Sequence, residues 1–225
     1  MTSIHRLAGV GSRIPGYPGH DQAADFVESS LGAMGFDYVH RETFEQAVPV
    51  DLGATLSCER LDEPVRIYPL WPNVVRLVST PAEGIVGELV YVGPGAMEDL
   101  NGLTLERSAA GPDGVEQVHR AVVLMEYNTM DNYLKLRSMG VGAILFIEPA
   151  EGAIRRHTEK KILEVPLDIP RFWVGRDQAL ALMAVAGRRV VSEAGQTSVT
   201  RGPTVRLDSR MEWRRAWGRN FTARL

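Results

Sequence analysis

The chain has 225 residues, of which 44% are hydrophobic and 24% are charged, so its composition is that of a globular protein with a sizeable core. Its 25 basic and 28 acidic residues give a net charge of −3, which argues against a dedicated nucleic-acid-binding protein because such proteins carry a basic excess. The single cysteine, Cys58, excludes an internal disulfide and a zinc site built from several cysteines. No apolar run approaches the roughly 18 residues that a membrane-spanning helix needs.

The N-terminal part of the chain predicts one helix and several strands. Apolar residues between Ala23 and Met34 recur with a helical period, and Gly35 suits the position after the helix ends. Residues 36–48 have the composition of a strand, which we expect Pro49 to limit. Two more short strands are expected, at residues 54–58 and 65–68.

Three apolar runs in the middle of the chain predict neighbouring strands: Ile85–Val92, Ala121–Met125 and Gly142–Ile147. Between the second and third runs, Asp131 suits the start of a helix and Gly140 its end. The order strand, helix, strand predicts a βαβ-like unit with at least one parallel pair. We therefore predict an α/β fold with an α+β tendency, in which one mixed β sheet contains all three runs and carries few helices.

The remaining segments predict surface structure and short elements. Residues 109–114 contain Gly and Pro and are typical of a surface loop, and the charged residues 154–163 predict an exposed loop or a short helix. A strand at residues 169–174 and a helix at 177–185 follow. Late strand candidates lie at residues 190–191, 204–207 and 220–225, and the last of these reaches the chain end with no closing element.

The sequence contains no motif typical of a catalytic or metal site. None of its five histidines lies in an HExxH pattern, and no serine lies in a GxSxG turn. Gly93-Pro94-Gly95 lacks the residues that follow in a phosphate-binding loop. Cys58 lies in an expected strand, so we interpret it as a buried structural thiol. We therefore predict no catalytic residue, no metal ligand and no cofactor in this chain.

One polar cluster resembles a site more than the others do. Glu126, Asn128 and Asp131 follow an expected strand and open an expected helix. Ligands often bind in α/β sheets at this end of a strand. The simpler interpretation, which we prefer, is that Asp131 caps the helix and Asn128 caps the turn.

The C-terminal segment 201–225 is rich in arginine and tryptophan. It contains seven arginines against two acidic residues, a local charge of +5. Arginine and tryptophan can stack on bases, which would suit nucleic acid, but they are also the favoured anchors of protein–protein contacts. We prefer docking to a protein or self-association, and both tryptophans could instead belong to the core. The predicted interface residues are Trp213, Arg214, Arg215 and Trp217.

Short motifs follow one another in an order that resembles a known family. The N-terminal part carries Gly11-Ser12-Arg13, Gly16-Tyr17-Pro18-Gly19, Ala23-Ala24 and Gly35-Phe36. The middle carries Gly87–Gly93, Ala121–Leu124, Leu136, Gly142–Phe146 and Ile169-Pro170, with Val174 and Leu180–Leu182 after them. Asn220-Phe221-Thr222-Ala223 lies near the end. These motifs resemble, in order, the N-terminal segment, the inserted protease-associated domain and the first peptidase-domain strand of the di-zinc aminopeptidases of metallopeptidase family 28.

The resemblance implies a non-catalytic region of such an enzyme. The family's metal ligands lie in a peptidase domain that follows the last motif, and no position here matches them, so the two zinc ions would belong to that missing domain. The implied role is to shape substrate access or to contact a protein partner. Alternatives are a stand-alone interaction module and, with least support, an enzyme that uses Glu126 or His119.

The resemblance also suggests a division of the chain and a compartment. We predict an N-terminal helix with flanking strands at residues 1–83, a protease-associated-like domain at 84–200, and C-terminal strands at 201–225 that lead to a missing peptidase domain. The family is secreted or periplasmic, whereas residues 1–13 contain no signal-peptide core.

Overall fold

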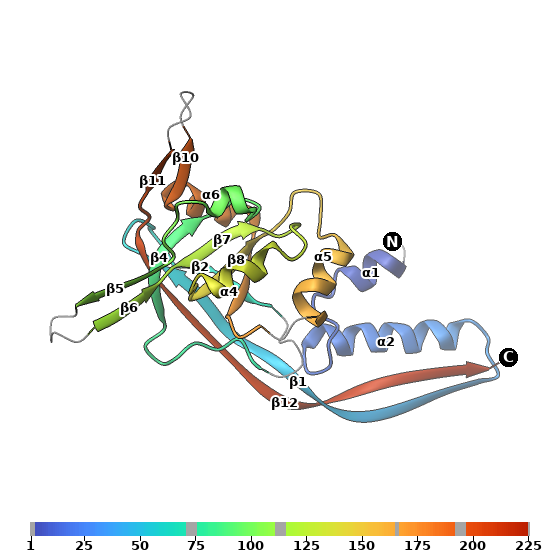
Figure 1. Cartoon of the computed structure of the whole chain (residues 1–225). Coiled ribbons are helices and arrows are strands. Elements are labelled where there is room, and N and C mark those ends of the chain that lie inside the picture. The colour runs from blue at the N-terminus through green and yellow to red at the C-terminus, as the bar shows by residue number, and fades with distance from the viewer. Residues whose placement is uncertain (1–2, 71–75, 111–115, 165–166, 192–196, 225) are drawn as a thin grey trace. The chain divides into compact units, whose positions relative to one another are not determined.

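The computed structural model describes residues 3–70, 76–110, 116–164, 167–191 and 197–224 (Figure 1). Its helices are α1 (Ser3–Ala8), α2 (Pro18–Ala33), α3 (Met97–Leu100), the 3₁₀ turn η1 (Asn132–Leu134), α4 (Lys135–Ser138), α5 (Arg155–Glu159), the π-helical turn η2 (Lys160–Glu164) and α6 (Arg176–Val185). Its strands are β1 (Tyr38–Ser57), β2 (Val65–Arg66), β3 (Tyr68–Pro69), β4 (Ile85–Tyr91), β5 (Glu106–Ala110), β6 (Glu116–Arg120), β7 (Val122–Glu126), β8 (Ala143–Ile147), β9 (Arg171–Val174), β10 (Arg188–Val191), β11 (Thr197–Thr200) and β12 (Thr204–Arg224).

The described chain divides into two compact units. Unit 1 comprises Met1–Val50 and Glu212–Leu225, and unit 2 comprises Asp51–Met211. The long strands β1 and β12 pass through both units, so unit 1 is made of two separate segments of chain, whereas unit 2 is one continuous segment. The domain boundaries expected after residues 83 and 200 stay predictions.

A mixed eight-stranded sheet organises the fold, in the order β2-β1-β12-β4-β7-β8-β9-β3. Strands β4, β7, β8 and β9 run parallel, whereas β12 joins β4 antiparallel. The three apolar runs of the sequence form β4, β7 and β8, which are direct neighbours. This confirms the predicted fold, a mixed sheet with few helices in which those runs belong together.

Both faces of the parallel strands are buried in unit 2. Leu124 and Leu145 face one apolar cluster together with Leu182 of α6, while Val123 and Ile144 face another cluster. A strand that is covered on both faces has an almost continuous apolar sequence, which is why these strands could be predicted from the sequence.

Two expectations about strand ends were wrong. Pro49 does not limit a strand, because β1 continues through it for 20 residues in all. The carbonyl of Pro49 accepts a hydrogen bond from the Tyr17 hydroxyl, so this position lies on the outer edge of β1, where no backbone N–H is needed. The separate strands expected at residues 204–207 and 220–225 are parts of one 21-residue strand, β12, which has β1 beside it.

Two further expectations need correction. The helix after Asp131 is only a 3₁₀ turn followed by one α-helical turn, and the Asp131 side chain makes no capping hydrogen bond. Residues 109–110 belong to β5, which pairs with β6 as a hairpin, while 111–114 lie outside the described residues.

The segment at residues 154–163, which we expected to be an exposed loop or a short helix, contains a fully buried lysine. The Lys161 ammonium donates to the carbonyls of Met130 (2.9 Å) and His157 (3.4 Å). Among the described residues it has no ion-pair partner, although the charge of Asp131 acts on it. Burial, together with a smaller effect of the positive charge of Arg171, outweighs the charge of Asp131 and lowers the pKa of Lys161 to about 8.

We predict that the free energy of unfolding rises as the pH increases from 8 to 10.5. In this window the folded chain has released the Lys161 proton while the unfolded chain still binds it, so raising the pH favours the folded state. The rise attributable to Lys161 is about 3 kcal/mol. Urea unfolding at several pH values measures it, with Lys161→Met as the matched variant. An equal rise in Lys161→Met would contradict the assignment.

Candidate protein interface

Unit 1 has a very small core. Its buried cluster consists of Val48 and Val50 of β1 and Ala216 of β12, with Ile14 and Tyr17 packed against it. Most side chains of β1 before Val48 and of β12 after Met211 are exposed. A two-stranded ribbon is at best marginally stable alone, so this unit depends on whatever covers it.

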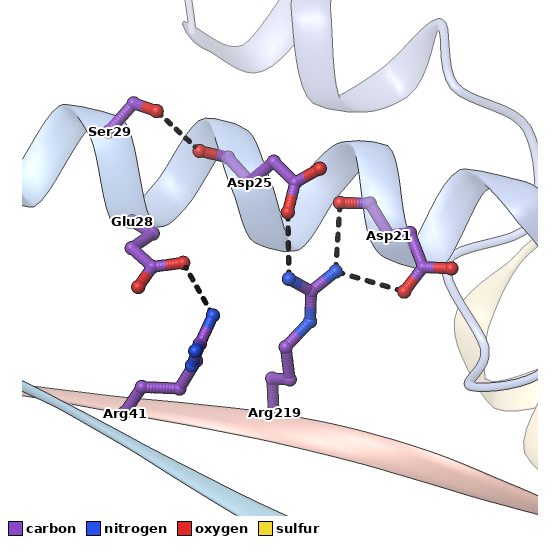
Figure 2. A network of polar contacts seen from close by, with 6 residues as sticks. All are labelled: Asp21, Asp25, Glu28, Ser29, Arg41 and Arg219. Atoms are coloured by element: carbon purple, nitrogen blue, oxygen red, sulfur yellow. Dashed lines mark hydrogen bonds and ion pairs between the residues drawn. The ribbon is translucent and has the colours of Figure 1, made fainter.

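A cation holds α2 beside the strand pair, as Figure 2 shows. Arg219 of β12 donates to the carboxylates of Asp25 (2.7 Å) and Asp21 (2.9 Å), and also to the Asp21 carbonyl. The hydrogen bond to Asp25 is the main cause that raises the pKa of Arg219. A second pair, Arg41 with Glu28 (3.5 Å), ties α2 to β1. Helix and ribbon are therefore joined by charged contacts as well as by the small core.

The two predicted tryptophans are exposed. Trp213 is 44% exposed and Trp217 is 62% exposed, so the alternative that both belong to the core is wrong. Tyr38 and Phe44 of β1 are also exposed, and the Phe44 ring packs on Gly218, where a Cβ would lie 2.4 Å from it. Unit 1 thus presents several large aromatic side chains to solvent, which is unusual for a monomer.

The predicted arginines are engaged in ion pairs within unit 1. Arg215 lies 3.5 Å from Glu45 of β1, and Arg214 pairs with Glu212 on its own strand. Together with Arg219 they are matched by acidic residues from three elements. The local charge of +5 seen in the sequence is therefore partly compensated in space by Glu45, Asp21 and Asp25, and this weakens the nucleic-acid interpretation.

The two edges of the strand pair differ. The outer edge of β1 carries Pro49 and is covered by Tyr17. On β12, Ser209 and Met211 turn their backbone groups toward Thr80 and Ser79, away from β1. Beyond Met211 the described chain offers this edge no backbone partner. By the alternation of a regular strand, Trp213 and Arg215 turn their N–H and C=O groups to the same open edge.

Unit 1 also contains an open groove of about 690 Å³ beside this strand. Apolar side chains from α1, α2 and β12 line it, with polar groups at one side. The lining includes Leu7, Ile14, Val27, Phe221, His20 and Arg219.

The structure does not bring the predicted polar cluster together at one point. Glu126 accepts a hydrogen bond from the Tyr91 hydroxyl (3.2 Å), and burial, then Glu126, raises the pKa of Tyr91 to about 12. The Asn128 amide instead bonds residues 152 and 154, while Asp131 is exposed. A binding role for Glu126, Asn128 and Asp131 stays a prediction.

Sequence reasoning missed the residue that organises unit 1. Arg219 lies almost two hundred residues from Asp21 and Asp25, so no local pattern could pair them. In the part of the chain that the structure describes, no group of three or more His, Cys, Asp or Glu side chains could hold a metal ion. No described helix is long and apolar enough to cross a membrane.

Comparison with known proteins gives a likeness of fold. No protein-family model matches the sequence, and no curated protein matches it. The crystal structure of a Peptidase M28 precursor from Shewanella amazonensis SB2B is similar with a TM-score of 0.52 and 14% identity, over 98% of this chain and 49% of that chain. This chain therefore spans about half the length of that neighbour, and at this identity the likeness shows the fold alone.

A second solved structure is more distant. The psychrophilic subtilisin-like protease Apa1 from the Antarctic Pseudoalteromonas sp. AS-11 has a TM-score of 0.37 and 11% identity, over 76% of this chain and 36% of that chain. Its TM-score is too low to carry an argument about this protein.

We expect Arg219→Ala to loosen α2 from the ribbon. The guanidinium is mostly buried but its two carboxylate partners are largely exposed, so the loss of stability should be about 1 kcal/mol rather than more. Hydrogen exchange of α2 amides measures the change directly. Arg214→Ala is the matched control, because its ion pair stays within β12 and its loss should leave α2 protected.

Proposed function

We propose that this chain is the non-catalytic accessory region of a family-28-type aminopeptidase, and that unit 1 is its docking surface for a peptidase domain. The observation that carries the proposal is the open edge of β12 flanked by exposed tryptophans. Unit 2 would then supply the protease-associated-like part, which shapes substrate access or contacts a protein partner.

The small core of unit 1 supports this proposal. Val48, Val50 and Ala216 form its only buried apolar cluster among the described residues, while Trp213 and Trp217 stay exposed. A surface of this kind gains stability when a partner covers it, and tryptophan with arginine is the combination that most often anchors such contacts.

The difference between the two strand edges supports one mode of docking. Exposed strand edges are usually blunted by proline, charge or a covering element. The β1 edge has Pro49 and Tyr17, whereas the β12 edge has neither. An added strand on β12 would pair with its free N–H and C=O groups and place its side chains beside Trp213.

The likeness to the Peptidase M28 precursor supports the choice of partner. It extends over nearly the whole of this chain but only half of the neighbour, which leaves room for a further domain. The runner-up is a stand-alone interaction module, which would use the same surface for an unrelated protein. In the preferred proposal, two zinc ions and the peptidase chemistry would belong to another domain.

We expect the isolated chain to self-associate through this edge, and Arg215→Pro to weaken that association at least about tenfold. Proline lacks a backbone N–H, so this substitution removes the residue-215 N–H that is expected to face the open edge. The pairing with β1 does not use this N–H and should remain. Sedimentation equilibrium over a range of concentrations measures the dissociation constant.

Two controls sharpen this experiment. Arg215→Ala loses the side chain and its ion pair with Glu45 but keeps the N–H, so it should weaken association less than Arg215→Pro does. Trp213→Ala combined with Trp217→Ala should weaken association while leaving the circular dichroism of the fold intact. A monomer at all concentrations, or salt-dependent sub-micromolar binding to DNA that Arg214→Ala abolishes, would contradict the docking proposal.

We further expect the purified chain to hold no stoichiometric zinc and to hydrolyse no aminoacyl chromogenic substrate. A catalytic zinc usually needs three protein ligands and an open position, and the described residues contain no such group. Elemental analysis and an aminopeptidase assay test this. One or two tightly held zinc ions per chain, or activity that copurifies with the chain, would overturn it.

A further inference from the structure

Lys161 lies inside a cage of three aromatic rings in unit 2. Its ammonium nitrogen is 5.0 Å from the ring centroid of Tyr127, 5.2 Å from that of Phe146 and 5.3 Å from that of Tyr133. The rings hold one another edge to face, since both tyrosines meet Phe146 at 81–86°. All three rings and the lysine are buried, so the cage is rigid and fully occupied.

The cage rings belong to the sheet and the turn after it, whereas the lysine comes from a separate segment. Tyr127 follows β7, Tyr133 lies in η1 and Phe146 lies in β8. Lys161 belongs to residues 152–162, which we call the strap. A side chain of the strap thus fills a hollow that the rest of unit 2 provides.

Polar contacts hold the strap in place. The Asn128 side chain accepts from the N–H of Ile154 and donates to the carbonyl of Gly152, each at 3.0 Å. The Tyr133 hydroxyl donates to the Lys160 carbonyl (2.8 Å), and the buried Arg171 donates to the Lys161 carbonyl. The Lys161 ammonium adds its bond to the carbonyl of Met130, a residue in the left-handed region at φ 48°.

The strap contributes almost no apolar burial. Lys161 is its only buried residue, and Ile154 is half exposed. Segments with few buried apolar contacts and many polar ties open locally without global unfolding. The strap can therefore detach locally while the sheet stays folded, because other residues form the apolar clusters that stabilise the sheet.

We propose that Tyr127, Tyr133 and Phe146 form a binding site for a primary alkylamine, which in this chain is filled by its own Lys161 and so latches the strap. Ring faces attract an ammonium, and the Met130 carbonyl accepts one of its hydrogens. The alkyl stem of Lys161 is buried together with its ammonium, as an apolar chain in such a site should be. This inference does not depend on the proposed docking of unit 1, because every residue in it belongs to unit 2.

The test is chemical rescue of the strap in Lys161→Ala. This substitution removes three carbons and the amine, which is the size of n-propylamine. We expect amides of residues 154–162 to exchange at least about tenfold faster than in the unaltered chain, with β7 and β8 unchanged. Added n-propylamine should restore protection in a saturable manner, and n-propanol, which has the same chain but a hydroxyl, should restore much less.

A second variant keeps the proposal testable if Lys161→Ala folds poorly. Lys161→Met fills the hollow with an apolar chain of similar length but without an amine, so its strap should exchange faster than in the unaltered chain, and n-propylamine should have no effect on it. Strap exchange in Lys161→Met equal to that in the unaltered chain would overturn the proposal. Equal rescue of Lys161→Ala by n-propanol would mean that the hollow recognises shape alone and would overturn the proposal. Absence of rescue by n-propylamine, or unchanged strap exchange in Lys161→Ala, would overturn it as well.

Discussion

The parallel strands β4, β7, β8 and β9 must be covered on both faces, and this constraint decides where the other elements of unit 2 go. A parallel sheet needs crossover connections, and the connections supply the cover. Leu182 of α6 closes one apolar cluster, while Tyr133 of η1 closes the other. The strap lies outside both clusters except at Lys161, so it is the part of unit 2 that the sheet does not itself require.

This constraint does not apply to unit 1, and the burial of its side chains differs accordingly. The ribbon formed there by β1 and β12 has a buried apolar cluster of only Val48, Val50 and Ala216, yet it exposes aromatic side chains that would normally lie in a core. Its helix is placed largely by Arg219 between two carboxylates. An element held in this way keeps its geometry without a core of its own, which is what a surface prepared for a partner requires.

The sequence predicts those parts of the molecule whose signal is local. The runs that form β7 and β8 are short, apolar and bounded by Gly or polar residues, so both strands and their parallel pairing could be derived. The full length of β1 and β12 could not, because residues that lie in an exposed ribbon show no apolar alternation and Pro49 suggests a stop. The sequence singles out both tryptophans as interface candidates but does not decide whether they are exposed. Two tryptophans four residues apart are compatible with a core as well as with a surface. Lys161 lies in a run of charges, and nothing near it in the sequence reveals the rings of residues 127, 133 and 146 that enclose it.

Arg219 and Lys161 perform the same task by opposite physical means. Each is a cation that ties a peripheral segment to a sheet. Arg219 meets carboxylates that are largely exposed to solvent, and ion pairs with such partners are weakened by salt. Lys161 meets rings and carbonyls in the interior, where salt does not reach but where burying the ammonium is costly. The tie in unit 1 therefore weakens with salt and the tie in unit 2 does not, so salt would loosen α2 while leaving the strap latched.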